Sequence, residues 1–373
     1  MLTCRPSYGP KDTWEKCPRR ENHNGVKVLR LWTTRFSKDN IVGRVFNSIT
    51  FLVPLAILHV LPRRKGEVFL YTTNPPYLGF VGAFVSLIRR HRYVVLLHDS
   101  YPEIVVWMGK IKKDGIIDRI WKFCNKIMYR RAEQTIVLSN AAKQLVCDNY
   151  EPEENRVHVI PNWADPDDLK PKPKTESNFA KEHGLIDPFT LLYSGNLGLY
   201  YEFDMILEMA QRLKGENFRL VFTGAGGQRS YIESVIKEKD LTNTLLLPYT
   251  PQEHFNDSLN CCDALLVTIA KGIDGISFPS KLYTSLSVGK PIIAFSAPNS
   301  ELRLKIENNQ VGSWVELGDT DSLVDSVKWM MTHPEEVKQM GQRARDLLVN
   351  EYSIEVSGKK YYDVLKLGYE AKR

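Results

Sequence analysis

Apolar and polar positions alternate in two different periods along the first 162 residues. Short runs rich in Val, Leu and Ile predict buried strands at residues 26–32, 68–72, 93–97, 135–137 and 157–159. Between these runs, apolar residues recur at helical spacing, as in residues 118–133. Strands that alternate with helices predict a parallel sheet with helices on both faces. We therefore interpret residues 1–162 as one α/β domain.

The same alternation returns between residues 188 and 350. Strand-like runs lie near Leu191, Leu220 and Leu245 and at residues 264–268 and 292–295, with helical patterns at 205–213 and 231–236. Residues 163–187 are rich in Asp, Pro and Lys, a composition that indicates a linker with a short helix. The last segment, residues 351–373, is amphipathic from 354 to 367. The pattern predicts two α/β domains, the second spanning residues 188–350.

Glycines follow two of the strands in the second domain. Gly195 precedes Asn196 after one apolar run, and Gly224 and Gly226 follow the next. Glycine after a strand allows a ligand to approach the backbone closely. One such loop is weak evidence, but two in the order strand, helix, strand indicate a nucleotide site at the carboxyl ends of a parallel sheet.

Residues 275–295 add a candidate anion-binding element. Pro279 suits the first turn of a helix, Gly289 suits its end, and Ser280 and Lys281 lie at its start. A helix N-terminus beside a lysine suits a diphosphate. Taken alone, the segment fits a capped helix with a solvated lysine better. Together with the two glycine loops, it favours nucleotide binding.

The order of these motifs resembles family 4 glycosyltransferases of the GT-B fold. The similar branch, of the colanic acid type, builds bacterial capsular and exopolysaccharide repeat units on lipid carriers. Residues 94–103, 136–139 and 159–163 of the first domain also fall where that family has landmarks. The resemblance implies two Rossmann-like domains facing across a cleft, with residues 351–373 crossing back onto the first domain.

The resemblance also implies a reaction and a set of residues. It implies a retaining, metal-independent hexosyltransferase that takes a nucleotide sugar as donor substrate and needs no other cofactor. The expected catalytic residues are His98, Asp99 and Lys281. The expected donor-binding residues are Gly195, Asn196, Gly224, Gly226, Pro279, Ser280, Lys281 and Thr284. Glu103 either contacts the acceptor or begins the next helix, and His98 has the alternative of a structural, hydrogen-bonded role.

Three departures from the family pattern stand out. The family commonly has glutamates where this chain has Ile276 and Thr284, and Thr284 cannot bind both ribose hydroxyls as a carboxylate does. An arginine often follows the first glycine loop in the family, whereas residues 199–202 here contain no cation. The family also begins with a strand, a glycine-rich loop and a helix before the segment matched by residues 2–6. We expect either a start further upstream or a domain that lacks its first unit.

Charge distinguishes the two halves of the chain. Residues 1–150 hold 25 Lys and Arg against 11 Asp and Glu, a balance of +14, whereas the remainder has a balance of −8. A basic half suits an anionic membrane or nucleic acid, and no nucleic-acid-binding motif accompanies it. Apolar stretches at 46–61 and 77–88 end in basic runs at 63–65 and 89–92. These stretches are either core-facing helices or part of a surface that meets the membrane and a polyprenyl-diphosphate-linked acceptor.

The sequence gives little indication of a metal site or of disulfide bonds. The six cysteines have no ligand-like spacing and fit reduced thiols. Asp165 and Asp167 lie in the Pro-rich segment, and Asp319 is expected to cap a helix, so we predict no metal site. We expect a cytoplasmic protein, peripheral on the inner face of the plasma membrane. The alternatives are a non-catalytic, membrane-associated glycosyltransferase-like subunit and a nucleotide-sugar epimerase.

Overall fold

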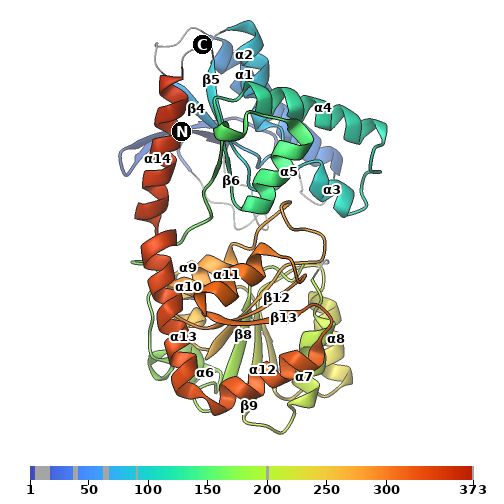
Figure 1. The fold of residues 1–373 in the computed structure, drawn as a ribbon, viewed down its shortest axis with the longest axis vertical. Helices are drawn as coiled ribbons and strands as arrows, with labels where there is room; N and C mark the ends of the chain where they lie inside the picture. Colours follow the sequence, from blue (N-terminus) through green and yellow to red (C-terminus); the bar gives the residue numbers. More distant parts are fainter. Residues whose placement is uncertain (5–16, 37–40, 62–66, 90, 199–200, 372–373) are drawn as a thin grey trace. The chain divides into compact units, whose positions relative to one another are not determined.

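A computed structural model describes residues 1–4, 17–36, 41–61, 67–89, 91–198 and 201–371 (Figure 1). The chain divides into two compact units. Unit 1 comprises residues 1–137, 146–158 and 363–373, and unit 2 comprises residues 138–145 and 159–362. The basic run at 63–65 lies outside the described residues.

Unit 1 is built on two sheets rather than the single parallel sheet expected from the sequence. Strands β4 (Val68–Thr72), β5 (Arg92–Leu96), β6 (Gln134–Val137) and β7 (Val157–Val159) form a four-stranded sheet in that order. The register between β4 and β5 is parallel, as is that between β5 and β6, so the alternation was correctly interpreted there. The helices of this unit are α1 (Ile41–Val60), α2 (Leu78–Ile88), α3 (Glu103–Trp107), α4 (Ile116–Arg131) and the end of α5 (Asn140–Tyr150), from residue 146 onward.

The second sheet of unit 1 contains an antiparallel hairpin that we did not predict. Its strand order is β1 (Leu2–Cys4), β3 (Val26–Leu31), β2 (Arg20–His23), and β2 runs antiparallel to β3. Asn24 and Gly25 join the two strands, both with positive φ (47° and 83°). An Asn-Gly pair with two positive φ values is the preferred two-residue hairpin turn, so the sequence did carry the signal.

Unit 2 has a six-stranded sheet in the order β10-β9-β8-β11-β12-β13, with every paired register parallel. The strands are β8 (Phe189–Ser194), β9 (Phe218–Thr223), β10 (Thr244–Leu247), β11 (Ala264–Thr268), β12 (Ile292–Ser296) and β13 (Gly312–Glu316). The helices are α6 (Asn178–Glu182), α7 (Asp204–Arg212), α8 (Arg229–Glu238), α9 (Gln252–Leu259), α10 (Lys281–Ser287), α11 (Glu301–Asn309), α12 (Thr320–Thr332) and α13 (Pro334–Leu347). This order is that of a dinucleotide-binding Rossmann domain, in which the order of the strands in the sheet reverses between the first strand and the fourth.

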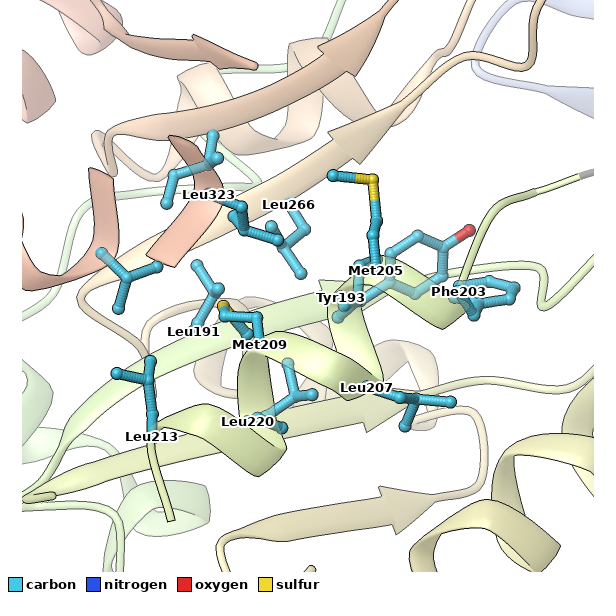
Figure 2. Packing of buried hydrophobic residues seen from close by; sticks show 14 of the residues in the cluster. Leu191, Tyr193, Phe203, Met205, Leu207, Met209, Leu213, Leu220, Leu266 and Leu323 are labelled. Atoms are coloured by element: carbon cyan, nitrogen blue, oxygen red, sulfur yellow. The ribbon is translucent and has the colours of Figure 1, made fainter. Parts of the chain in front are cut away.

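The core of unit 2 lies between this sheet and its helices. Figure 2 shows Leu191 and Tyr193 of β8 beside Met205 and Met209 of α7, with Leu323 of α12 nearby. All five side chains are buried. The alternation of strands and amphipathic helices therefore produces the predicted layered core, which fixes the carboxyl ends of the strands in place.

Residues 163–187, interpreted from composition as a linker, are instead packed on unit 2. Leu169, Ser177 and Leu185 are buried. Ser177 caps α6 by accepting a hydrogen bond from the Ala180 amide, and Lys174 pairs with Asp263 at 2.6 Å. The Pro-rich composition did not predict this packing, because the residues that make the contacts are spaced widely along the segment.

The last helix belongs to both units. Helix α14 (Ile354–Glu370) begins in unit 2, and the residues from 363 onward belong to unit 1. There, the Arg92 guanidinium donates to the Tyr369 carbonyl. None of the described helices is both long and apolar enough to span a bilayer. All six cysteines are free thiols.

Candidate functional site

A cavity of about 460 Å³ lies in unit 2, at the point where the strand order reverses. Ser194, Gly195 and Asn196 reach it from the end of β8, and Thr268 and Ala270 reach it from the end of β11. The two strands are neighbours in the sheet but not in the chain, so their following loops diverge and leave a crevice. Ligands of open α/β sheets bind at such points.

Lys281 places a buried cation in this cavity. Its Nζ atom is buried and has no hydrogen-bond partner in the described part of the chain, although the side chain keeps some surface in the cavity. The nitrogen lies 3.7 Å from the centroid of the Tyr193 ring and 5.2 Å from that of Tyr201. Burial lowers the pKa of Lys281 to about 7. An ammonium buried without a partner is costly, and an anionic ligand would compensate it.

The helix that carries Lys281 begins slightly later than the sequence indicated. Lys281 is its first residue and Ser280 its N-cap, so Pro279 precedes α10 rather than occupying its first turn. Gly289 ends the helix with a φ of 63°, as predicted. Pro279, Ser280 and Thr284 all line the cavity. The Thr284 hydroxyl donates to the Lys281 carbonyl at 3.0 Å, so it is directed along its own helix.

The expected donor-binding glycines divide into two groups. Gly195 lines the cavity, and a Cβ atom there would lie 3.5 Å from the Lys281 Nζ. Gly224 and Gly226 are not among its lining residues. Their φ values are 154° and 157°, and Cβ atoms on them would lie 1.9 Å from the Gly195 carbonyl oxygen and 2.3 Å from that of Leu197. These two glycines let one loop pack against the other, which holds the loop that lines the cavity.

His98 and Asp99 lie in unit 1, after the carboxyl end of β5, and both are half-buried. The Thr73 hydroxyl accepts from the His98 amide and donates to the Asp99 carbonyl, both at 3.1 Å. Burial lowers the pKa of His98, and the charge of Asp99 partly opposes this shift. The two hydrogen bonds of Thr73 therefore hold the backbone of His98 and Asp99 in place at the carboxyl end of β5, where open α/β sheets bind their ligands.

Glu103 is the first residue of α3, in agreement with the simpler of its two interpretations. Its carboxylate accepts from the Ser100 hydroxyl at 3.0 Å, the Asn149 amide at 3.2 Å and the Tyr150 hydroxyl at 2.5 Å. These three partners all belong to unit 1 and support the loop that carries Asp99.

The acidic motifs considered as metal sites have structural roles. Asp319 caps α12 by accepting from the Ser322 amide at 3.0 Å, as predicted. Asp165 accepts from the Asp167 amide at 2.8 Å, closing a short turn. Within the described ranges, no three His, Cys, Asp or Glu side chains are grouped as metal ligands.

Sequence reasoning missed the aromatic surroundings of Lys281. Tyr193 was interpreted only as part of a strand, and Tyr201 only as part of a segment without a cation. Trp163 and Tyr249 also line the cavity. No local pattern pairs these residues with Lys281, because separate loops of the sheet bring them together.

Family models match both halves of the chain. Residues 1–163 match the glycosyl transferase 4-like domain, and residues 175–347 match the glycosyl transferases group 1. The two matches correspond closely to the two predicted domains, and together they support a family 4 glycosyltransferase of the GT-B fold.

Individual proteins are similar to this chain over shares that range from 30% to 92% of its length. The probable glycosyltransferase WbjE of Pseudomonas aeruginosa is 26% identical over 282 residues, which are 74% of this chain and 69% of WbjE. WcaI of Escherichia coli K12, named for colanic acid biosynthesis, is 29% identical over 30% of this chain and 28% of its own. The crystal structure of Anabaena HepE in complex with UDP-glucose has a TM-score of 0.70 at 14% identity, covering 92% of this chain and 86% of HepE. The fold is thus GT-B with two Rossmann-like domains.

Proposed function

We propose that this glycosyltransferase moves a hexose, with retention of configuration, from a nucleotide sugar to a lipid-linked glycan acceptor in surface polysaccharide synthesis. The observation that supports the proposal best is the buried Lys281 nitrogen. It has no hydrogen-bond partner in the described chain, and it lies in the cavity at the point where the strand order of unit 2 reverses. The crystallised UDP-glucose complex of HepE, a protein of the same fold, supports a nucleotide-sugar donor.

Lys281 would stabilise the charge that develops on the departing nucleoside diphosphate. A cation that is fixed in a poorly solvated site stabilises developing charge more strongly than one in water, and it needs no reorganisation. Residues 194–196, beside the Lys281 nitrogen, would hold the diphosphate together with it, and Thr284 would face the nucleoside. Gly224 and Gly226 would contribute by fixing the loop of Gly195 and Asn196.

The acceptor side is assigned to unit 1. His98 and Asp99, at the carboxyl end of β5, would contact the transferred sugar and the acceptor hydroxyl. The +14 balance of residues 1–150 supports an anionic membrane surface as the place where a polyprenyl-diphosphate-linked acceptor is met. The name of WcaI supports the pathway. The proposal therefore includes peripheral attachment to the cytoplasmic face of the plasma membrane and no metal cofactor.

Single-turnover assays test the reaction. Purified protein is mixed with UDP- and GDP-hexoses and a short polyprenyl-diphosphate-linked sugar, and the product is examined by NMR for its anomeric configuration. We expect transfer with the α or β configuration of the donor retained. Inversion would exclude the retaining mechanism, and absence of both transfer and donor hydrolysis across the panel would exclude the enzyme.

A non-catalytic subunit is the second candidate, and Thr284 is the observation that favours it. Its hydroxyl is engaged with the Lys281 carbonyl, and no carboxylate stands at this position for the ribose. Nucleotide binding without turnover, alone and with every donor tested, would favour this candidate over the enzyme.

A further inference from the structure

Helix α4 exposes large apolar side chains on its outer face and buries two polar side chains, beside Met128 and Tyr129, on its inner face. Ile116, Ile120 and Phe123 recur at helical spacing, and all three are exposed; Ile116 is 79% and Phe123 65% accessible. On the opposite face, Asp118 and Asn125 are buried, with accessibilities of 0% and 2%. An ordinary surface helix has the reverse arrangement, so the outer face of α4 is suited to a further apolar environment.

Asp118 and Asn125 both have hydrogen-bond partners on this inward face, although the second carboxylate oxygen of Asp118, Oδ1, has none in the described part of the chain. The Asp118 carboxylate accepts from the Asp114 amide and from the Lys122 ammonium, both at 2.8 Å. The Asn125 amide donates to the Tyr101 carbonyl at 2.5 Å and to the Tyr150 hydroxyl at 3.0 Å. Turning the helix over would bury the isoleucines but break the two hydrogen bonds of Asn125, which join α4 to Tyr101 and Tyr150.

The charged residues around the outer face of α4 indicate which kind of environment covers it. Residues 110–131 contain eight Lys and Arg against two Asp. Lys110, Lys112 and Lys113, in the loop before α4, and Arg119, beside the apolar stripe, are exposed. Two copies of this chain would repel each other through such a face. A helix with exposed large apolar residues flanked by cations is typical of one that lies in the interface of an anionic bilayer.

We propose that the outer face of α4, with the loop of residues 109–115, inserts into an anionic membrane surface. The inference rests on the lipid-linked acceptor of the proposed function and places the entry of that lipid beside the loop of residues 98–103. The Tyr101 ring stacks on Trp121 of α4 with centroids 5.9 Å apart, and Asn125 holds the Tyr101 carbonyl. Lipid contact at α4 would thereby position the loop that follows His98 and Asp99.

Helix α1 offers a matched comparison within the same unit. Ile49, Val53 and Ile57 form an exposed apolar stripe along it, and residues 45–60 contain no Lys or Arg. Helix α1 packs against α2, and α2 packs against α4. The α1 stripe therefore has similar apolar exposure with fewer cations around it, since residues 44–65 hold four Lys and Arg, all at the two ends of the stripe, against eight in residues 110–131.

Vesicle sedimentation tests the inference with the full chain. The vesicles contain phosphatidylcholine with about 30% phosphatidylglycerol, or phosphatidylcholine alone. We expect the triple variant Ile116→Gln, Ile120→Gln, Phe123→Gln to partition onto anionic vesicles about tenfold or more weakly than the wild type. The matched variant Ile49→Gln, Val53→Gln, Ile57→Gln should remain within about twofold. An environment-sensitive fluorophore on Ile120→Cys should shift to the blue with anionic vesicles, and one on Val53→Cys should not.

Three outcomes would overturn the inference. They are loss of binding by the α1 variant but not the α4 variant, no vesicle binding by the wild type at low salt, and a wild-type dimer that the α4 variant converts to a monomer. UDP affinity and thermal unfolding of each variant report its fold. If vesicle binding fails while nucleotide binding and transfer persist, only this inference fails. If vesicle binding behaves as expected but no sugar is transferred, the proposed function fails instead.

Discussion

The ammonium nitrogen of Lys281 lies over the face of the Tyr193 ring, 3.7 Å from its centroid. Tyr193 is fully buried in β8, and its hydroxyl donates to the Asn196 carbonyl at 2.8 Å. One ring therefore holds both the cation of the cavity and the backbone of the loop that lines it. A cation over an aromatic face is stabilised by about 0.5–2 kcal/mol, which offsets only part of the cost of burying it. The remaining cost is what an anionic ligand would relieve.

The cost of burying Lys281 should appear in the pH dependence of stability. Its pKa in the folded protein, about 7, lies below the unfolded value near 10.5, so the unfolded state binds more protons between these values. The free energy of unfolding contributed by this group therefore rises as the pH rises through that window. Relative to Lys281→Met, the wild type should gain roughly 2 kcal/mol between pH 7 and pH 9. Urea unfolding of both proteins at the two pH values measures this difference, and parallel pH profiles would mean that Lys281 is not perturbed.

The contact between the two glycine loops predicts a strong effect of a single methyl group. Gly224→Ala places a Cβ atom 1.9 Å from the Gly195 carbonyl oxygen, at a φ of 154°. We expect a loss of stability of about 2 kcal/mol or more, with weaker nucleotide binding because the Gly195 loop must move.

Gly358→Ala is the matched control for that substitution. Gly358 lies in α14, and nothing stands within 4 Å of the added Cβ atom. This substitution should stabilise the protein by about 0.5–1 kcal/mol. Equal effects of the two substitutions in thermal unfolding would contradict the proposed loop packing.

Metal dependence separates two ways of stabilising the leaving diphosphate. With Lys281 as the cation, sugar transfer should continue at an unchanged rate in excess EDTA. Complete loss of transfer in EDTA that manganese restores would instead mean that a metal ion stabilises the leaving diphosphate. Asp165 or Asp319 would then again be a candidate metal ligand.

Local patterns were enough to predict most strands and to single out Lys281, which lines the cavity. Residues 68–72, 157–159 and 264–268 form strands with the expected ends, because each is a short apolar run between polar turns. Lys281 was identified because Pro279 and Gly289 delimit a short helix between two strands. These inferences need only neighbours in the sequence.

Features set by distant neighbours could not be predicted in the same way. The burial of Lys281 depends on Tyr193, which β8 brings beside it across the sheet. The inward orientation of Asn125 depends on the Tyr101 carbonyl and the Tyr150 hydroxyl, although the periodicity alone predicts apolar residues inside. The turn at Asn24 and Gly25, in contrast, needs only the Asn-Gly pair itself and is a feature that the sequence alone can predict.

Proton-linked nucleotide binding tests the central claim, that the Lys281 ammonium receives a nucleoside diphosphate. Calorimetric titrations with UDP and with GDP are run at pH 8 in buffers of different ionisation enthalpy. Lys281 is mostly neutral at this pH, so a bound diphosphate should draw close to one proton onto it. Lys281→Met should abolish this uptake and weaken binding by about 1.5–3 kcal/mol, whereas Lys237→Met, at an exposed position on α8, should change neither. Identical affinity and proton uptake in the wild type and in Lys281→Met would contradict the account.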